Sequence, residues 1–251
     1  MGLNSEIVQF IKKRLLPPYN SIENYERFFM PYLQFHSALC TTTIATLNQI
    51  LVPLIEAHSE RFFCRVDDSH PIKSPVSVIE KILRSEKEAR EKQADEKETS
   101  TEYDLANFYT SMTDLARFRI VCNFLTDVEE VSHSIEQSKD IENFFVLYEI
   151  SNTIRQHKRK SGERSIKIVL KQIRPPNLFL EIQIMTQLQE AWDKKDHYLV
   201  YEKRRSSSHS ADVNFPTYLD EKMFAMAELL YVADDYVDML RKEEEMEVYN
   251  K

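Results

Sequence analysis

An α+β fold with helical ends is predicted by three features of the sequence. Apolar residues recur at spacings of three and four near both ends of the chain, which is typical of amphipathic helices. In the middle, short segments alternate apolar and polar residues or are rich in β-branched residues, as strands are. The 251 residues, 42% of them hydrophobic, suffice for one packed core. We therefore expect one compact unit with an N-terminal helical region at 1–60, a core at 61–206 and a C-terminal helical extension at 207–251.

Composition excludes several classes of protein. The net charge of −8 argues against a protein that coats nucleic acid, although it leaves room for a local basic site. Only two glycines are present, which excludes Gly-rich phosphate loops and the dinucleotide fingerprint, because both need glycine for close backbone approach. Three widely spaced cysteines without a C-x-x-C motif favour a reduced, cytoplasmic protein. No apolar run approaches 18 residues, so no membrane partner is expected.

Helices are expected at both ends of the chain. Ser5 is the expected N-cap of the first helix, and Pro17-Pro18 stops it. A second apolar-periodic region runs from about 25 to 55, with Pro31 marking a break and Pro53 an end. Further helices are expected at 74–83, capped by Ser74, and at about 186–203 and 220–242. The highly charged segment 84–98 is interpreted as a solvated helix extension or loop.

Five strands are expected in the middle of the chain, at 62–66, 115–124, 144–150, 165–173 and 178–184. Residues 67–71 are expected to form a turn after the first of them. The last two strands form a plausible antiparallel hairpin across residues 174–177. A helix follows the second strand, with Thr126 as its expected cap.

Two carboxylates stand out because they accompany strands that are otherwise apolar. Asp114 begins the strand at 115–124, and Glu181 lies in the middle of the segment LFLEIQI. A buried, unpaired carboxylate costs several kcal/mol, so each needs a cation, a metal or access to water. If the two strands are neighbours, the pair is a hard-oxygen site for Mg²⁺ holding a polyphosphate. In the alternative, Glu181 is the solvent-facing half of the alternation.

The segment 155–174 concentrates positive charge in an acidic protein. It carries eight Lys and Arg residues against the single acid Glu163. Such a local field suits phosphates or the end of a polynucleotide, or it is a solvated basic loop. Farther along, Trp192 is interpreted as a core anchor, and spacing alone makes His197 a surface histidine.

Taken in order, four sequence blocks between about Lys73 and Lys203 resemble the synthetase domain of the RelA/SpoT family. The blocks are IKSPVSVIEKILR, DLARFRIVCNF, GERSIKIVL and LEIQIMTQLQEAWDKKDHYLVYE. The last block is similar to the family pattern of a Glu-x-Gln strand followed by Ala-Trp and then a His and a Tyr four apart. Any one block alone would be weak, whereas four in the family's order are specific.

The resemblance implies a nucleotidyltransferase-like mixed sheet of about five strands flanked by helices. It also implies Mg²⁺-dependent transfer of pyrophosphate from ATP to the ribose 3′-hydroxyl of a guanosine or other nucleotide, which is alarmone synthesis in the stringent response. The implied catalytic residues are Asp114, Glu181 and His197, with Asp114 and Glu181 also holding the metal. Implied ATP-binding residues are Lys73, Ser77, Lys81, Arg84 and Arg119. Implied acceptor-binding residues are Gly162, Glu163, Arg164, Ser165, Lys167, Gln183 and Tyr201.

The chain departs from the family pattern at four positions. Glu163 stands where the family has a Tyr that stacks on the acceptor base, and Lys167 stands in place of a His. Loss of stacking, worth about 1–3 kcal/mol, would weaken a free nucleotide roughly 10- to 100-fold. Pro71 replaces an Arg two residues before Lys73, and Arg117 replaces a Gly. The lost phosphate contact leaves His70 or Arg65 as candidates to replace it.

Three functions are therefore compatible with the sequence. The first is a pyrophosphokinase with an altered acceptor site. The second is a toxin that pyrophosphorylates the 3′ end of tRNA, which the basic segment favours and the net charge does not; such a protein would have an antitoxin partner. The third is an inactive nucleotide-binding or regulatory module, against which the retention of Asp114, Glu181, Gln183 and His197 argues. A homo-oligomer is compatible with each of them.

Overall fold

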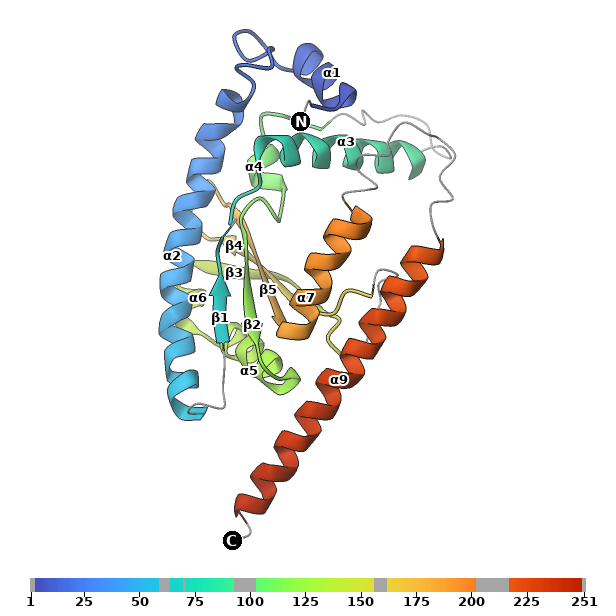
Figure 1. The fold of residues 1–251 in the computed structure, drawn as a ribbon. Coiled ribbons are helices and arrows are strands. Elements are labelled where there is room, and N and C mark those ends of the chain that lie inside the picture. The colour runs from blue at the N-terminus through green and yellow to red at the C-terminus, as the bar shows by residue number, and fades with distance from the viewer. Residues whose placement is uncertain are drawn as a thin grey trace.

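The protein, seen in a computed structural model, is described over residues 3–58, 64–69, 71–92, 103–155, 162–201 and 217–249. Helices surround a central sheet (Figure 1). The helices are α1 (Ser5–Arg14), α2 (Glu26–His58), α3 (Pro75–Lys92), α4 (Phe108–Ser111), α5 (Leu125–Glu136), α6 (Lys139–Glu142), α7 (Gln187–Asp196) and α9 (Thr217–Tyr249), and the π-helical turn η3 (His197–Tyr201) follows α7. The strands are β1 (Cys64–Asp67), β2 (Arg117–Cys122), β3 (Phe145–Asn152), β4 (Ile166–Gln172) and β5 (Phe179–Thr186).

The five strands form one mixed sheet in the order β1-β2-β5-β4-β3. Strands β2 and β5 are parallel, and the other neighbours are antiparallel. The hairpin expected across residues 174–177 is confirmed, with Lys167 of β4 opposite Gln183 of β5. The predicted α+β fold, with about five strands and helical ends, is thus confirmed.

The two faces of the sheet differ in chemistry because side chains alternate along each strand. On one face Ile168, Ile182 and Ile184 are fully buried in the core that the sheet shares with α2 and α5. The other face carries polar side chains, among them Arg119 and Gln183, which occupy paired positions on β2 and β5. The core face therefore holds the strands in register, and the polar face is available for chemistry.

Helix α2 is continuous, so the expected break at Pro31 and end at Pro53 are wrong. Each proline removes one helical hydrogen bond and crowds the preceding turn. The helix nevertheless buries Phe29 and Leu33 beside Pro31, and Leu51 beside Pro53, in the hydrophobic core. Burial of these side chains beside each proline outweighs the lost bonds.

Among the described residues, helix α2 also passes a test of length and composition for a membrane-spanning helix, which alone is weak evidence for one. An 18-residue window within its segment Glu26–Ala57 has a mean hydropathy of 1.5, so by length and composition this helix could cross a membrane. A core helix passes the same test of length and composition. In this fold α2 runs along the sheet (Figure 1), and its Leu39, Cys40 and Leu47 join the core cluster of the strands.

Several element boundaries differ from the prediction. Asn4, rather than Ser5, caps α1 by accepting a hydrogen bond from the Glu6 N–H group. Strand β2 begins at Arg117, two residues later than expected, and ends at Cys122. Strand β1 starts at Cys64, whereas the predicted strand residues 62 and 63 lie outside the described part of the chain. The charged segment 84–98 continues α3 as far as residue 92, and its remainder also lies outside the description.

Thr126 does not cap the helix that follows β2. Helix α5 begins at Leu125, two residues earlier than a Thr126 cap implies, and the Asp127 carboxylate accepts a hydrogen bond of 3.2 Å from the Phe124 N–H group. The Thr126 hydroxyl instead donates to Asp238 of α9 at 2.6 Å. A residue more than 100 positions away thus decides the role of Thr126.

Helix α9 holds α7 against the sheet. The Trp192 side chain is buried, and its indole N–H donates to the Met223 carbonyl at 2.9 Å, which confirms the predicted core anchor. Thr186 caps α7 by accepting a hydrogen bond of 3.3 Å from the Gln189 N–H group. Its hydroxyl donates to the buried Asp234 of α9 at 2.6 Å.

The Asp234 contact makes stability depend on pH. Burial raises the pKa of Asp234 to about 6, although hydrogen bonds from Thr186 and Gln189 lower it, and the neighbouring Asp238 charge raises it further. An acid whose pKa is higher in the folded protein stabilises it at low pH. That contribution, roughly 3 kcal/mol, is lost as the pH rises through the folded pKa.

We therefore expect Asp234→Asn to flatten the change in free energy of unfolding between about pH 4 and pH 7, measured by urea denaturation. The neighbouring Asp235→Asn, at a largely exposed carboxylate, is the matched control and should keep the dependence of the unaltered protein. Equal pH dependence in both variants would contradict the assignment.

Candidate active site

Parallel pairing brings Asp114 and Glu181 to the same end of the sheet. Asp114 lies three residues before β2, and Glu181 pairs with Arg117, the first residue of that strand. The Glu181 N–H group donates to the Ala116 carbonyl at 2.9 Å. Burial raises the pKa of Glu181, and the nearby Asp114 charge raises it further. Glu181 is half-buried on the polar face of the sheet, at the end where Asp114 also lies.

Two lysines surround the Asp114 carboxylate. The Lys73 Nζ lies 3.3 Å from Oδ2, and the Lys81 Nζ contacts Oδ1. Burial opposes ionisation of Asp114, but the charges of Lys73 and Lys81 outweigh it and lower the pKa of the carboxyl group. Since Lys73 precedes α3 and Lys81 lies within it, this ion cluster joins α3 to the sheet end that carries Glu181.

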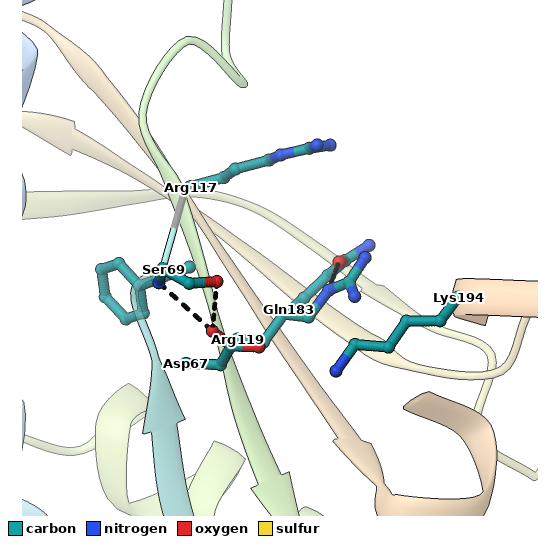
Figure 2. A pocket seen from close by; sticks show the side chains of 7 residues that line it. Asp67, Ser69, Arg117, Arg119, Gln183 and Lys194 are labelled. Atoms are coloured by element: carbon teal, nitrogen blue, oxygen red, sulfur yellow. Dashed lines mark hydrogen bonds between the residues drawn. The ribbon is translucent and has the colours of Figure 1, made fainter. Parts of the chain in front are cut away.

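A cavity of about 250 Å³ opens on the polar face of the sheet (Figure 2). It is lined by Asp67, Ser69, Arg117, Phe118, Arg119, Gln183 and Lys194. The strand register places Asp67 opposite Arg119, Arg119 opposite Gln183, and Gln183 opposite Lys167. These four side chains form one row across the sheet, with one side chain on each of four neighbouring strands. Along the row the groups are an acid, a base, an amide and a base.

Helix α7 supplies carboxylates to this row. The Arg119 Nε donates to the Gln183 Oε1 at 3.1 Å, and the terminal nitrogen Nη2 of Arg119 contacts the Asp193 carboxylate. Arg65 of β1 contacts Glu190 one turn earlier on α7. Lys194 extends from α7 toward the cavity in Figure 2. The cavity is thus a basic surface on which Arg119 is held by Asp193 of the adjacent helix.

The two substitutions at the expected acceptor site contact each other. The Lys167 Nζ lies 2.5 Å from the Glu163 carboxylate, and the Gln183 amide donates to the same oxygen at 3.2 Å. The Ser165 hydroxyl also donates to that oxygen, at 3.4 Å. After burial, which raises the pKa of Glu181, Lys167 is the largest charge acting on that carboxyl group and lowers its pKa. The ammonium group of Lys167 therefore contacts Glu163 and also acts through its charge on Glu181.

The expected ATP-binding residues of α3 share one face of the helix. Ser77, Lys81 and Arg84 are spaced by four and three residues, and such spacing places side chains above one another. The Ser77 N–H group is capped by the Ser74 hydroxyl at 3.2 Å, which confirms the predicted start of this helix.

Gly162 and Arg164 contact α9 instead of joining the row on the sheet. Gly162 has a φ of +81°, and a Cβ there would lie 2.7 Å from the Cβ of Ala227, so only glycine fits. The buried Arg164 forms an ion pair of 2.7 Å with Glu228, and its guanidinium lies 3.9 Å from the ring centre of Tyr231. These contacts give both residues a role in packing.

His197 and Tyr201 begin and end the η3 turn. The His197 side chain is exposed, as predicted, whereas the Tyr201 side chain lies outside the described part of the structure. Of the two candidates to replace the lost arginine, Arg65 is engaged with Glu190, and His70 lies outside the description. Residues 156–161 of the basic segment also lie outside it.

Sequence reasoning missed four residues that line the cavity, namely Asp67, Ser69, Phe118 and Lys194. The turn after β1 was predicted, and Asp67 does accept a hydrogen bond of 3.2 Å from the Ser69 N–H group. Its proximity to Arg119 depends on the pairing of β1 with β2, which local patterns do not reveal.

The family to which the chain belongs follows from comparison with known proteins. The family model described as "Region found in RelA / SpoT proteins" matches residues 70–206, more than half of the chain. The protein therefore belongs to the RelA/SpoT family and to the pyrophosphokinase class of enzymes.

One relative is similar in sequence, and two solved structures are similar in fold. The GTP pyrophosphokinase YwaC of Bacillus subtilis (strain 168) is 24% identical over 168 residues, covering 62% of this chain and 70% of YwaC. The structure of small alarmone synthetase 1 from Bacillus subtilis superposes with a TM-score of 0.60 at 22% identity, covering 88% of this chain and 98% of that one. Small alarmone synthetase 2 from the same organism gives a TM-score of 0.59 at 18% identity, covering 86% and 98% of the two chains.

The contact between Glu163 and Lys167 predicts non-additive effects on stability. Lys167→Met leaves a half-buried carboxylate without its cation, and Glu163→Gln does the converse, whereas the double variant leaves neither charge unpaired. We expect a coupling free energy of roughly 1–3 kcal/mol in a double-mutant cycle measured by urea denaturation. Additive single effects would mean that the ion pair contributes nothing to the fold.

Proposed function

We propose that the protein transfers the pyrophosphoryl group of ATP to the ribose 3′-hydroxyl of a guanosine nucleotide. The observation that carries the proposal is the meeting of Asp114 and Glu181 at one end of the sheet, within reach of Lys73 and Lys81. In the proposed step the 3′ oxygen bonds to the β-phosphorus while the bond from that phosphorus to the α–β bridging oxygen breaks. AMP leaves, and the hydroxyl proton passes to Glu181.

The donor side of the site is basic. Lys73, Ser77, Lys81, Arg84 and Arg119 are proposed to hold the phosphates of ATP. Lys73 and Lys81 are held in place by Asp114, so they are preorganised for an anionic ligand. Positioning and neutralisation of charge are the main requirements of polyphosphate transfer, because little covalent chemistry falls to the protein.

The carboxylates of Asp114 and Glu181 fit Mg²⁺. Both offer hard oxygen atoms and act on one another electrostatically, and Mg²⁺ commonly takes one or two carboxylates together with substrate phosphates and water. Among the described residues no group of three or more His, Cys, Asp or Glu side chains could hold a metal alone, as expected for a metal shared with the substrate. When bound, Mg²⁺ would supply neutralisation of the polyphosphate charge.

The acceptor side is proposed to comprise Glu163, Lys167 and Gln183, with Ser165 beside Glu163. Gly162 and Arg164 are left out because they pack on α9, whereas acceptor roles for Tyr201 and His197 stay predictions from the family resemblance. A carboxylate beside an ammonium group matches the edge of guanine, whose N1–H and N2–H₂ groups donate and whose O6 accepts. The name of the related YwaC, a GTP pyrophosphokinase, supports the same acceptor class. A cytoplasmic location belongs to the same proposal.

The role of Glu181 is tested by Glu181→Gln, which keeps the shape of the side chain and removes its charge. We expect transfer of label from γ-labelled ATP to fall by roughly 100-fold or more, with the thermal unfolding midpoint retained. Glu149→Gln, at an exposed position of β3, is the matched control and should keep full activity. Activity that survives in Glu181→Gln would contradict the assignment.

The acceptor is identified by offering GDP, GTP, ADP, ATP and bulk tRNA in parallel with γ-labelled ATP and Mg²⁺. Label on GDP or GTP supports the proposal, whereas label on tRNA would replace it with the toxin activity. Transfer to none of them, with a thermal shift on addition of Mg-ATP, would identify a nucleotide-binding module.

A further inference from the structure

Among the described residues of this site, Arg117 is a cation whose side chain forms no ion pair or hydrogen bond. It opens β2 and lines the cavity, and its side chain is exposed. Among the described residues its guanidinium makes no hydrogen bond or ion pair. The surrounding cations are all engaged: Lys73 and Lys81 with Asp114, Arg119 with Asp193, Lys167 with Glu163, and Arg65 and Lys194 with Glu190.

The position of Arg117 is next to the proposed reacting groups. It pairs with Glu181 across β2 and β5, and directly paired residues project from the same face of a sheet. The Arg117 charge acts on both Glu181 and Lys73. Figure 2 shows Arg117 and Arg119 extending from β2 in the same direction.

Arg117 also lies directly opposite Pro71. Its N–H group donates to the Pro71 carbonyl at 2.8 Å, and the Lys73 N–H group donates to the Leu115 carbonyl at 3.0 Å. Ile72 and Ala116 form an antiparallel bridge between these two bonds. Positions 71 and 117 are therefore cross-strand partners, whose side chains leave the backbone on the same side.

These are the two positions at which the chain exchanges residues relative to the RelA/SpoT pattern. The pattern has Arg at the position of Pro71 and Gly at that of Arg117. Because positions 71 and 117 face each other across the bridge, having the arginine at 117 instead of 71 moves the guanidinium to the neighbouring strand. The guanidinium stays on the same face of the sheet. Neither Arg65 nor His70 is needed to replace the lost cation.

We propose that Arg117 binds the β- and γ-phosphates of the nucleoside triphosphate donor, replacing the arginine that Pro71 displaces. The inference rests on the proposed function and adds a specificity-determining residue to it. Arg117 selects a triphosphate over a monophosphate, because a monophosphate lacks the β- and γ-phosphates whose oxygens its planar guanidinium would bind.

The test compares binding of α,β-methylene-ATP and of AMP in the presence of Mg²⁺ by calorimetry, which needs no turnover. We expect Arg117→Gln to weaken binding of the triphosphate roughly 10- to 100-fold and to leave AMP binding unchanged. Arg27→Gln, at an exposed arginine of α2 that does not line the cavity, is the matched control and should bind like the unaltered protein.

A relocation variant separates a phosphate contact from a structural role. Arg117→Gly should lose triphosphate affinity, and the double variant Pro71→Arg/Arg117→Gly should recover at least part of it. Equal triphosphate binding by Arg117→Gln and the unaltered protein would overturn the role of Arg117 alone. Failure of the unaltered protein to bind the triphosphate would overturn the proposed function and this inference together.

Discussion

Parallel pairing of β2 with β5 is the constraint on which the candidate active site depends. The two strands are separated in the chain by α5, α6, β3 and β4, and they are the one parallel pair in the described sheet. Parallel alignment places the start of both strands at the same edge, so Asp114 and Glu181 meet there. Antiparallel alignment of the same strands would separate the carboxylates by the length of a strand, about 20 Å, and no shared site would form.

Once the carboxylates are together, the rest of the site follows from the need to compensate charge in a partly buried place. Lys73 and Lys81 lie against Asp114, and Lys167 contacts Glu163 while its charge lowers the pKa of Glu181. Each ion pair holds a cation in position without a ligand, and a polyphosphate can compete for the same cation when it binds. The network thus stabilises the fold and prepares the site with the same groups.

Sequence patterns predicted the features that depend on neighbouring residues. The alternation of LFLEIQI and its hairpin, the Ser74 cap and the burial of Trp192 are properties of short segments, and the structure confirms them. The features that were predicted wrongly depend on contacts between residues that are far apart in the sequence. Burial of α2 against the sheet overrides Pro31 and Pro53, and Asp238 of α9 removes Thr126 from its expected cap. The cavity lining depends on pairing between strands, which periodicity does not specify.

The departures from the family pattern illustrate the same distinction. In linear order Glu163, Lys167, Pro71 and Arg117 are four separate changes, each of which removes or adds a group that ought to damage the site. In space they are two contacts, one between Glu163 and Lys167 and one between the backbones of Pro71 and Arg117. Within each contact one change compensates for the other, since the first pair carries no net charge and the second keeps one guanidinium. A site altered in compensating pairs retains the charge distribution that polyphosphate chemistry requires. The departures from the family pattern therefore argue for an altered binding site for the acceptor nucleotide more strongly than for a loss of activity.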